Sequence, residues 1–508
     1  MSSVVLPNAP GVYTNVEPPP FQIVGTPTNI IGYVGTASWG PVNSPVNIGG
    51  MKQQISVFGP MLNALMDLGT SVFISILQKA SQFVCVRVTD GTDTKATVDL
   101  MDTATPTPAE GALLTALYSG AVGNTITAAI TSGSVTGTFT LTITRAGFTP
   151  EVFTNISGTG SAFWQNLVNA VNSGTISRGP SQLVVASLPT TLSVSPPNDT
   201  TIYSLIGGTN GNSTVTATTL VGTPASPRSG MYALSGTEAS IVVLCDNYTA
   251  TTFPAIEAFC IANNMYGFVS GTSGQTANNV TANVTFFSAT GVASHQIKFL
   301  AGDWCFFSDP YNNIPMRMVT PLAFAAAREA TLGPEQSGLN KQIVGIIATQ
   351  STLANQRYDK SDMATYRTAG IDAIVKPISR GKVFGLGNGI NSSSNPAIID
   401  DSYTRMTNFL ATTFNLAGGQ FEGGVQTPSF WADEEAAVSD FLSQLRTPAA
   451  PPAVISDYSV TADATNNTPT EVTEGLNNIY VQVQYFGIAV KVIFTLQAGS
   501  NVVISHAA

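Results

Sequence analysis

The chain has 508 residues, more than one compact core accommodates, so we expect a multidomain protein. Hydrophobic residues make up 43% of it, which argues against global disorder, whereas only 10% are charged, against roughly 25% in a typical soluble protein. The net charge of −10 arises from 30 acidic and 20 basic residues, and without a cluster of Lys and Arg it argues against nucleic-acid binding.

The low charge content leaves two interpretations open. An assembly whose subunits bury much of their surface tolerates such a composition, and so does a Thr- and Ser-rich extracellular β protein. The opening MSSVVLPNAPGVY has no basic start followed by a long apolar run, so it does not indicate a secretory signal. No apolar stretch approaches the ~18 residues of a membrane span. We therefore expect folding in the cytoplasm and no membrane insertion.

The first twenty residues predict an extended arm. Pro7, Pro10 and the prolines at 18–20 disfavour helix, and the segment has no pattern for a core of its own. An extended segment with spaced apolar residues requires a surface, either of its own domain or of a neighbouring molecule. The apolar residues concerned are Val12, Tyr13 and Val16.

Residues 22–88 predict the beginning of an α/β unit. The segment 30–35 is typical of a short buried strand, 61–80 of a largely helical stretch, and 83–88 of a β-branched strand. The order strand, helix, strand suits an α/β layer.

Residues from about 89 to 227 differ in composition from the preceding segment, because Thr, Ser and Gly dominate and charged residues are rare. The alternating run 137–147 predicts a strand with one buried face. A helix is predicted over 161–172, with Ser161 as its N-cap. The residues on its apolar face are Trp164, Leu167, Val168 and Val171. We interpret this region as an inserted, β-rich domain.

The α/β pattern then resumes. Buried strands are predicted at 240–246 and 266–271, with a helix opened by Pro254 between them. A further helix is predicted over 322–330 and a strand over 342–349. The order indicates that the core continues after the insertion.

The C-terminal part begins near Asp400. Helices are predicted around 402–414 and 436–446, and a Pro-rich break follows at 447–454. The run 478–497 predicts a long strand, alternating in its first half and apolar on both faces in its second. Because the sequence shows no partner for it within the chain, we expect it to pair in a sheet elsewhere.

The search for catalytic chemistry assigns no residue. His295 and His506 are the only histidines, so a two-His metal site would need both, and we expect His506 to lie in a fraying terminus. A Ser-His-Asp triad would have to use His295, which lies in a strand-like segment. Residues 271–275 and 385–390 approach the nucleophile-elbow and dinucleotide patterns, but each lacks its final glycine. The acidic group at 433–435 is interpreted as helix capping. Cys85, Cys245, Cys260 and Cys305 are widely spaced and are interpreted as buried thiols.

Three segments near the N-terminus carry a resemblance. They read PGVYTNVEPPP from residue 10, IIGYVGTASWGPVNSPVNIGG from residue 30 and ISVFGP from residue 55, and together they resemble the opening of the contractile tail sheath family of bacteriophages. The matching positions are Pro10, Gly11, Val12, Tyr13, Gly35, Gly40, Pro41, Pro45, Val46, Phe58 and Gly59. Residues 117–130, 203–211 and 363–387 resemble later family segments in the same order.

The resemblance implies an α/β (α+β) multidomain fold, with a sheath-type core, an inserted β-rich domain and extended arms at both ends. The expected division is an N-terminal arm at 1–21, core at 22–100, inserted outer domain at 101–227, core at 228–399, a C-terminal helical part at 400–475 and a strand arm at 476–508. The arms are expected to add strands to neighbouring subunits. The candidate residues are Val12, Tyr13, Val16, Val481, Val483, Tyr485, Val490, Val492 and Phe494.

The resemblance also implies a function without catalysis or cofactor. Sheath subunits form a virion structure of stacked hexameric rings around a tail tube, assembled in the host cytoplasm. The sheath contracts to drive the tube through the host envelope for genome ejection. The implied partners are further copies of the chain, the tail tube protein, and the baseplate and tail terminator proteins, with no nucleic acid. The alternatives are another self-assembling virion or surface-layer protein and, third, a polysaccharide hydrolase of a virion.

Overall fold

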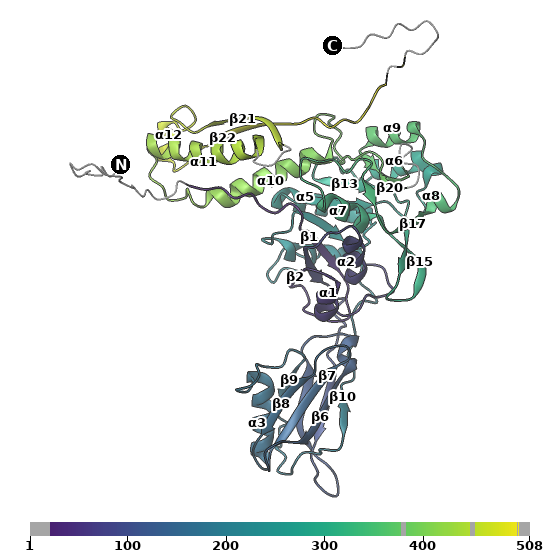
Figure 1. Cartoon of the computed structure of the whole chain (residues 1–508), viewed down its shortest axis with the longest axis vertical. Coiled ribbons are helices and arrows are strands. Elements are labelled where there is room, and N and C mark those ends of the chain that lie inside the picture. The colour runs from purple at the N-terminus through teal and green to yellow at the C-terminus, as the bar shows by residue number, and fades with distance from the viewer. Residues whose placement is uncertain (1–20, 377–382, 448–452, 495, 497–508) are drawn as a thin grey trace, which may run out of the picture.

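The computed structural model describes residues 21–376, 383–447, 453–494 and 496. Figure 1 shows an elongated molecule with three units in a row. A β-rich unit lies at the lower end, an α/β unit in the middle, and a helical unit with a β-hairpin at the upper end. The mixed α/β class predicted from the sequence is confirmed.

The middle unit contains a seven-stranded sheet in the order β18-β13-β12-β11-β1-β3-β2. Its strands are β1 (Ile31–Gly35), β2 (Pro45–Ile48), β3 (Phe83–Arg87), β11 (Ile241–Leu244), β12 (Tyr266–Ser270), β13 (Ile297–Leu300) and β18 (Ile371–Asp372). All neighbours run parallel except β2, which is antiparallel to β3. Because β1 pairs with both β3 and β11, segments before and after the insertion form one sheet, as predicted.

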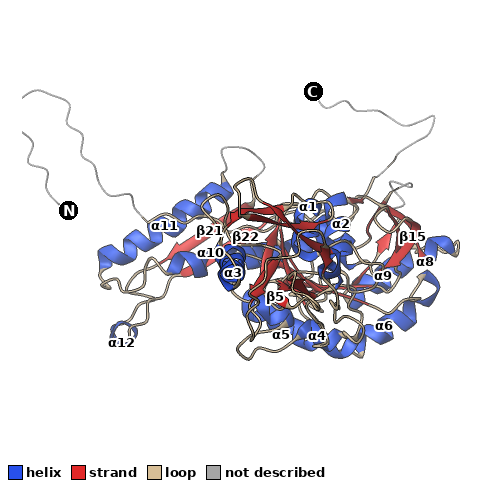
Figure 2. Ribbon diagram, turned by 90° about the horizontal axis from the view of Figure 1, so that it is seen from below, coloured by secondary structure: helices blue, strands red, loops and turns tan. Residues whose placement is uncertain are grey.

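Helices cover both faces of this sheet, as a buried parallel sheet requires. One face packs against α1 (Met51–Phe58), α2 (Leu68–Leu77) and α7 (Leu322–Ala330). The other packs against α4 (Ala217–Val221), α5 (Phe253–Asn263), α6 (Val280–Ser288) and α9 (Lys360–Ala369). In Figure 2, α1 and α2 lie on one side of the strands, and α4, α5 and α6 on the other.

Short 3₁₀ helices are η1 (Ala121–Thr125), η2 (Gly230–Leu234), η3 (Ala250–Thr252) and η4 (Ala277–Asn279).

Two three-stranded sheets flank the middle unit. One contains β15 (Ile314–Val319), β14 (Cys305–Asp309) and β17 (Ile346–Thr349), and the other β16 (Gln342–Ile343), β20 (Phe384–Leu386) and β19 (Ile374–Val375). The single strand predicted over 342–349 is therefore wrong, because its halves belong to different sheets. Gly345 separates them with φ +87°, and a Cβ there would approach Leu77 Cδ1 to 2.7 Å. The helix α8 (Gln350–Leu353) follows β17.

The helix predicted over 61–80 is shorter in the structure. Asp67 ends the preceding loop and caps α2, because its carboxylate accepts the backbone N–H groups of Thr70 at 2.7 Å and Leu62 at 3.1 Å. This cap starts the helix at Leu68 and holds residues 62–67 in a turn.

The lower unit is β-rich, as predicted, and has its own core. One sheet contains β4 (Thr97–Met101), β5 (Glu110–Ala116) and β9 (Val184–Ser187), and the other β10 (Ile202–Ser204), β6 (Ile126–Ser132), β7 (Phe139–Arg145) and β8 (Glu151–Ile156). The helix α3 (Ser161–Ser173) buries Trp164, Leu167 and Val171, but its N-cap is Gly160, so the predicted cap at Ser161 is wrong.

Two arginines join this unit to the middle one. Arg87, fully buried at the end of β3, donates to the carbonyls of Gly40 at 2.8 Å, Ser119 at 2.7 Å and Asn210 at 3.1 Å. Arg145, at the end of β7, donates to two carbonyls in the last turn of α1. Hydrogen bonds from a buried charged donor are strong, so these contacts fix the insertion on the core.

Replacing Gly111 by Ala is expected to destabilise the lower unit by about 1–3 kcal/mol, because a well-packed core resists added volume. A Cβ at Gly111 would lie 2.2 Å from the indole of Trp164, which is fully buried. Thermal unfolding followed by circular dichroism measures the loss. Gly179→Ala in the same unit is the control, because nothing lies within 4 Å of its Cβ. Equal stability of both variants would contradict this packing.

The upper unit is formed by α10 (Asp401–Gly418), α11 (Pro428–Arg446), β21 (Ile455–Thr461), α12 (Pro469–Thr473) and β22 (Tyr480–Tyr485). Its apolar cluster includes Met406 and Leu410 from α10 and Phe441 and Leu442 from α11. The predicted helices are confirmed, but α11 begins at Pro428, capped by the Thr427 side chain.

The capping interpretation of Asp433, Glu434 and Glu435 is wrong, because an N-terminus at Pro428 places them in the second turn of α11. Glu434 is instead fully buried and accepts a hydrogen bond from Asn477 Nδ2 at 2.7 Å. Burial raises its pKa.

Candidate assembly interface

The upper unit binds the beginning of the described chain as well as its end. The Phe21 ring contacts Phe421 edge-on at a centroid distance of 5.0 Å. Ile23 joins the apolar cluster of α10 and α11. Thr26 donates its backbone N–H to Thr413 Oγ1 at 3.1 Å. The beginning of the described chain is therefore anchored to the upper unit, to which β22 near its end also belongs.

The predicted long strand over 478–497 is wrong in two respects. Among the described residues of this run only Tyr480–Tyr485 form a strand, β22, and residues 486–494 have no regular secondary structure. Moreover, β22 has a partner within its own chain, because it pairs antiparallel with β21 from Tyr480 opposite Thr461 to Tyr485 opposite Ile455. Each strand of this hairpin keeps one edge without a strand partner among the described residues. Such an edge is a template for a further strand.

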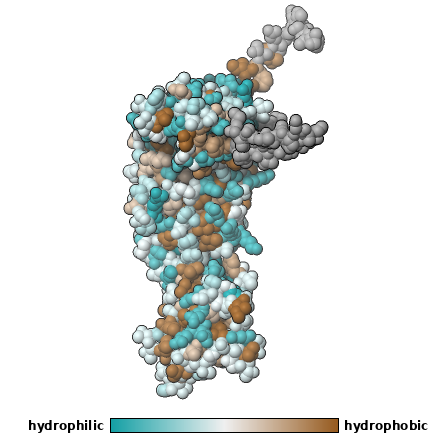
Figure 3. Space-filling model, turned by 90° about the vertical axis from the view of Figure 1, so that its left-hand side faces the viewer, coloured by the Kyte–Doolittle hydropathy of each residue, from teal (hydrophilic) through white to brown (hydrophobic). Residues whose placement is uncertain are grey.

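The segment after β22, residues 486–494, presents large apolar side chains to solvent. Val492 is 71% exposed, Ile493 85% and Phe494 90%, and Lys491 is the only charged residue of the segment. In Figure 3 brown atoms continue upward from the body of the molecule toward the grey C-terminal trace. A soluble chain rarely exposes such a run unless it is a binding surface. We call residues 486–494 the exposed C-terminal segment.

The candidate residues fall into three groups. Val481, Val483 and Tyr485 pack against the cluster of their own upper unit. The Tyr485 hydroxyl lies 3.2 Å from Thr407 Oγ1, and burial raises its pKa. Val490, Val492 and Phe494 lie in the exposed C-terminal segment. Val12, Tyr13 and Val16 lie outside the described residues.

Sequence reasoning missed Tyr480, Phe486 and Ile493, which are 58%, 52% and 85% exposed. The sequence prediction selected every second residue, because it assumed a strand, in which alternate side chains point to the same face. The segment beyond Tyr485 is not a strand, so adjacent residues are exposed together. The signal was present in the sequence as an apolar run with a single charge.

The crevice that binds ligands in many doubly wound sheets is filled here. Such crevices lie at the carboxyl ends of the strands, where the winding direction changes. Asp246, just after β11, accepts the backbone N–H groups of Met66 and Thr320, both at 3.1 Å. The loop before α2 and the segment before α7 therefore occupy this position.

The sequence patterns that approached catalytic motifs have structural roles. Ser273 Oγ accepts a hydrogen bond from Gln350 Nε2 at 2.9 Å. The next helix after residues 385–390 is α10, which begins only at Asp401. A dinucleotide fingerprint requires a glycine-rich turn that leads directly from a strand into a helix, and this segment does not provide one. His295 is half-buried and contacts Tyr403 edge-on, and burial lowers its pKa.

The cysteines and acidic residues do not gather into a site. All four cysteines are buried, and burial raises the pKa of each thiol. Across the described ranges no three His, Cys, Asp or Glu side chains are arranged to hold a metal ion. None of the described helices has both the length and the apolar character that crossing a bilayer requires.

No protein-family model and no curated protein matches the sequence. Solved structures do match. The sheath tail protein of Desulfitobacterium hafniense superposes with a TM-score of 0.52 at 14% identity, covering 89% of this chain and 93% of that one. The sheath tail protein of Listeria innocua gives 0.52 at 14% identity, covering 91% and 96%. The helical sheath of the anti-feeding prophage in its contracted state gives 0.55 at 10% identity, covering 97% and 99%. The chain therefore has the fold of contractile sheath proteins, which confirms, for the fold, the resemblance seen in the sequence.

Proposed function

We propose that this chain is the structural subunit of a contractile tail sheath of a bacteriophage. The observation that supports it best is the exposed C-terminal segment, which extends from a β-hairpin with open edges on a sheath-type fold. An apolar segment of this kind gains stability when a neighbouring molecule covers it. The chain itself is structural and carries out no catalysis.

In this proposal, neighbouring subunits are linked by strand addition. The exposed C-terminal segment of one subunit pairs with an open edge of the β21–β22 hairpin of the next, and the N-terminal arm does the same on another subunit. Added strands contribute main-chain hydrogen bonds that depend little on side-chain detail. The linking part of the C-terminus is narrower than the predicted arm 476–508, because β22 belongs to its own subunit.

The assembled state would be stacked hexameric rings around a tail tube, in contact with baseplate and tail terminator proteins in the virion. Subunits would rotate on contraction while their strand links persist, and the tube would be driven through the host envelope for genome ejection. The energy would come from interfaces formed in the contracted state, because two packings of the same subunits differ in free energy. The inserted lower unit would form the outer surface.

Deleting residues 1–20 is expected to leave a folded subunit that no longer forms tubes. The described contacts of Phe21, Ile23 and Thr26 with the upper unit remain in this variant, so its fold is retained. Negative-stain electron microscopy of the purified protein, alone and with the cognate tube protein, measures assembly. Circular dichroism provides the control for folding.

Wild-type tubes or stacked rings that disappear on deletion support the proposal. Normal tubes from the deletion variant would contradict the role of the N-terminal arm. Small particles from the wild type, even with the tube protein present, would contradict the sheath function. Flat two-dimensional arrays would instead indicate a surface-layer protein.

A further inference from the structure

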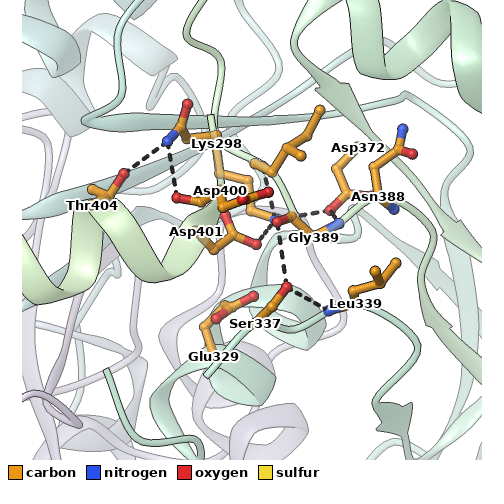
Figure 4. A network of polar contacts seen from close by, with 12 residues as sticks. Lys298, Glu329, Ser337, Leu339, Asp372, Asn388, Gly389, Asp400, Asp401 and Thr404 are labelled. Atoms are coloured by element: carbon orange, nitrogen blue, oxygen red, sulfur yellow. Dashed lines mark hydrogen bonds and ion pairs between the residues drawn. The ribbon is translucent and has the colours of Figure 1, made fainter. Parts of the chain in front are cut away.

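Five ionisable side chains meet in the interior between the central sheet and the upper unit. They are Lys298 on β13, Glu329 on α7, Asp372 on β18, and Asp401 and Arg405 on α10. None is more than 4% exposed. Figure 4 shows Lys298, Asp372 and Asp401 close together, with Glu329 beside Asp401 and Ser337. We call these five side chains the buried charge cluster.

Lys298 is fully paired. Its Nζ lies 2.9 Å from Asp372 Oδ2 and 2.7 Å from Asp401 Oδ2, and it donates to the Ile390 carbonyl at 3.0 Å. Burial lowers its pKa, but the two carboxylates outweigh burial and raise it overall. The two carboxylates therefore hold Lys298 in its cationic form.

Two of the three carboxylates are also saturated as acceptors. Asp372 accepts the backbone N–H groups of Asn388 and Gly389, each at 2.9 Å, besides its ion pair. Asp401 accepts Lys298 on one oxygen and the Tyr266 hydroxyl on the other. Donors from the backbone, from Tyr266 and from Lys298 therefore surround both carboxylates.

Glu329 differs from both. Within the described part of the chain, neither of its carboxyl oxygens accepts a hydrogen bond, whereas a hydrogen bond with the Asp401 carboxyl is among the contacts that raise its pKa. Arg405 Nη1 is 3.6 Å away, an ion-pair distance too long for a hydrogen bond. Arg405 directs its own donors to the carbonyls of Leu332 at 2.8 Å and Gly333 at 2.9 Å. Gly338 leaves the space for the carboxyl, because a Cβ there would lie 2.1 Å from Glu329 Oε1.

The charges of the cluster do not balance. Three carboxylates face two cations, and the neighbouring phenol of Tyr266 stays neutral because burial and the Asp401 charge raise its pKa. Glu335, half-buried beside Arg405, adds a further negative charge at the edge of the cluster. A buried net charge is costly, so one proton on a carboxyl group would balance the cluster. Burial, followed by the charge of Asp401, raises the pKa of Glu329 to about 8.

We propose that Glu329 holds this proton, and that the cluster is a proton-dependent lock between the central sheet and helices α7 and α10. With Glu329 protonated, the cluster is neutral and fixes α10, which carries the upper unit, to the sheet. When Glu329 ionises at alkaline pH, an uncompensated negative charge beside Asp401 weakens this junction.

The direction of the pH effect follows from linkage. The ordinary pKa of a glutamate is 4.5 and that of Glu329 in the folded protein is about 8, so unfolding between these pH values releases one proton. The unfolding equilibrium constant then rises about tenfold for each pH unit in this window. The stability that Glu329 contributes is complete below pH 4.5 and is lost as the pH rises through 8.

Wild type and Glu329→Gln are compared by urea unfolding from pH 5 to 9.5, because Gln is neutral at every pH and reproduces the shape of the protonated carboxyl. Glu422→Gln, at an exposed position, is the control. Asp67 also titrates in this window, since burial raises its pKa to about 7. The difference between wild type and Glu329→Gln isolates Glu329.

Glu329→Gln is expected to release one proton fewer on unfolding at pH 6.5 and to exceed the wild type in stability at pH 9. Glu422→Gln should match the wild type. Equal pH slopes in wild type and Glu329→Gln would overturn the proposal, and so would a Glu329→Gln protein that fails to fold. Asp401→Asn gives a second readout, because without the adjacent charge the Glu329 step should move to lower pH. An unmoved step would also overturn the proposal.

Discussion

Replacing Lys298 by Met is expected to lower the free energy of unfolding by about 3–5 kcal/mol, the typical cost of removing one partner from a buried ion pair. Lys298 is fully buried, and its ammonium group is the nearest cation to both Asp372 and Asp401. Met fills a volume similar to that of Lys. The loss in unfolding free energy therefore measures the removal of the positive charge and not the creation of a cavity. Urea unfolding at pH 7 measures it.

Two further variants separate charge from packing. Lys360→Met changes an exposed lysine on α9 and is expected to stay within about 0.5 kcal/mol of the wild type. Adding Asp401→Asn to Lys298→Met removes one of the two unpaired carboxylates and should restore part of the lost stability. A Lys298→Met protein as stable as the wild type would show that the cluster contributes nothing to the fold.

The sequence predicted best those elements whose signal is local. The strands at 83–88 and 240–246 are short apolar runs, and the helix over 322–330 has the same bounds in the structure. The prediction failed where a residue outside the local pattern determines where an element begins or ends. The strand over 342–349 breaks at Gly345, where φ is +87° and Leu77 of α2 leaves no room for a Cβ. The start of α11 depends on Thr427, which precedes the apolar pattern that revealed the helix.

The buried charge cluster was not predicted, although one signal was present. Lys298 stands between Ile297 and Phe299 in a strand-like run, where a charge requires a buried partner. Its partner Asp401 is 103 residues away, a separation that one sequence alone does not bridge. The hairpin pairing of β22 was missed for the same reason, because the alternation in 478–485 indicates a half-buried strand but not its partner.

This pairing changes how the C-terminal arm should be tested. Deleting all of 478–497 would remove β22 and uncover the cluster of the upper unit, since Val481, Val483 and Tyr485 pack against it. Loss of assembly would then report misfolding. Changing only the exposed C-terminal segment leaves the hairpin intact, so the fold and the interface can be examined separately.

The triple variant Val492→Ser, Ile493→Ser and Phe494→Ser is expected to abolish tube formation without changing subunit stability. Burying each such side chain contributes about 1.5–3 kcal/mol, so association should weaken by about a thousandfold or more. The three side chains are 71%, 85% and 90% exposed in the subunit, so unfolding should be nearly unaffected. Electron microscopy and analytical ultracentrifugation measure assembly, and urea unfolding measures the subunit.

The control for this variant is Val135→Ser with Ile176→Ser in the lower unit, where both side chains are also exposed. It removes apolar surface elsewhere on the molecule and should assemble normally, because the lower unit forms the outer surface in the proposed sheath. Normal tubes from the triple variant would exclude the exposed C-terminal segment as the link between subunits. Loss of assembly in both variants would show that general surface hydrophobicity, and not this segment, drives association. Only the selective loss identifies the segment as the inter-subunit strand.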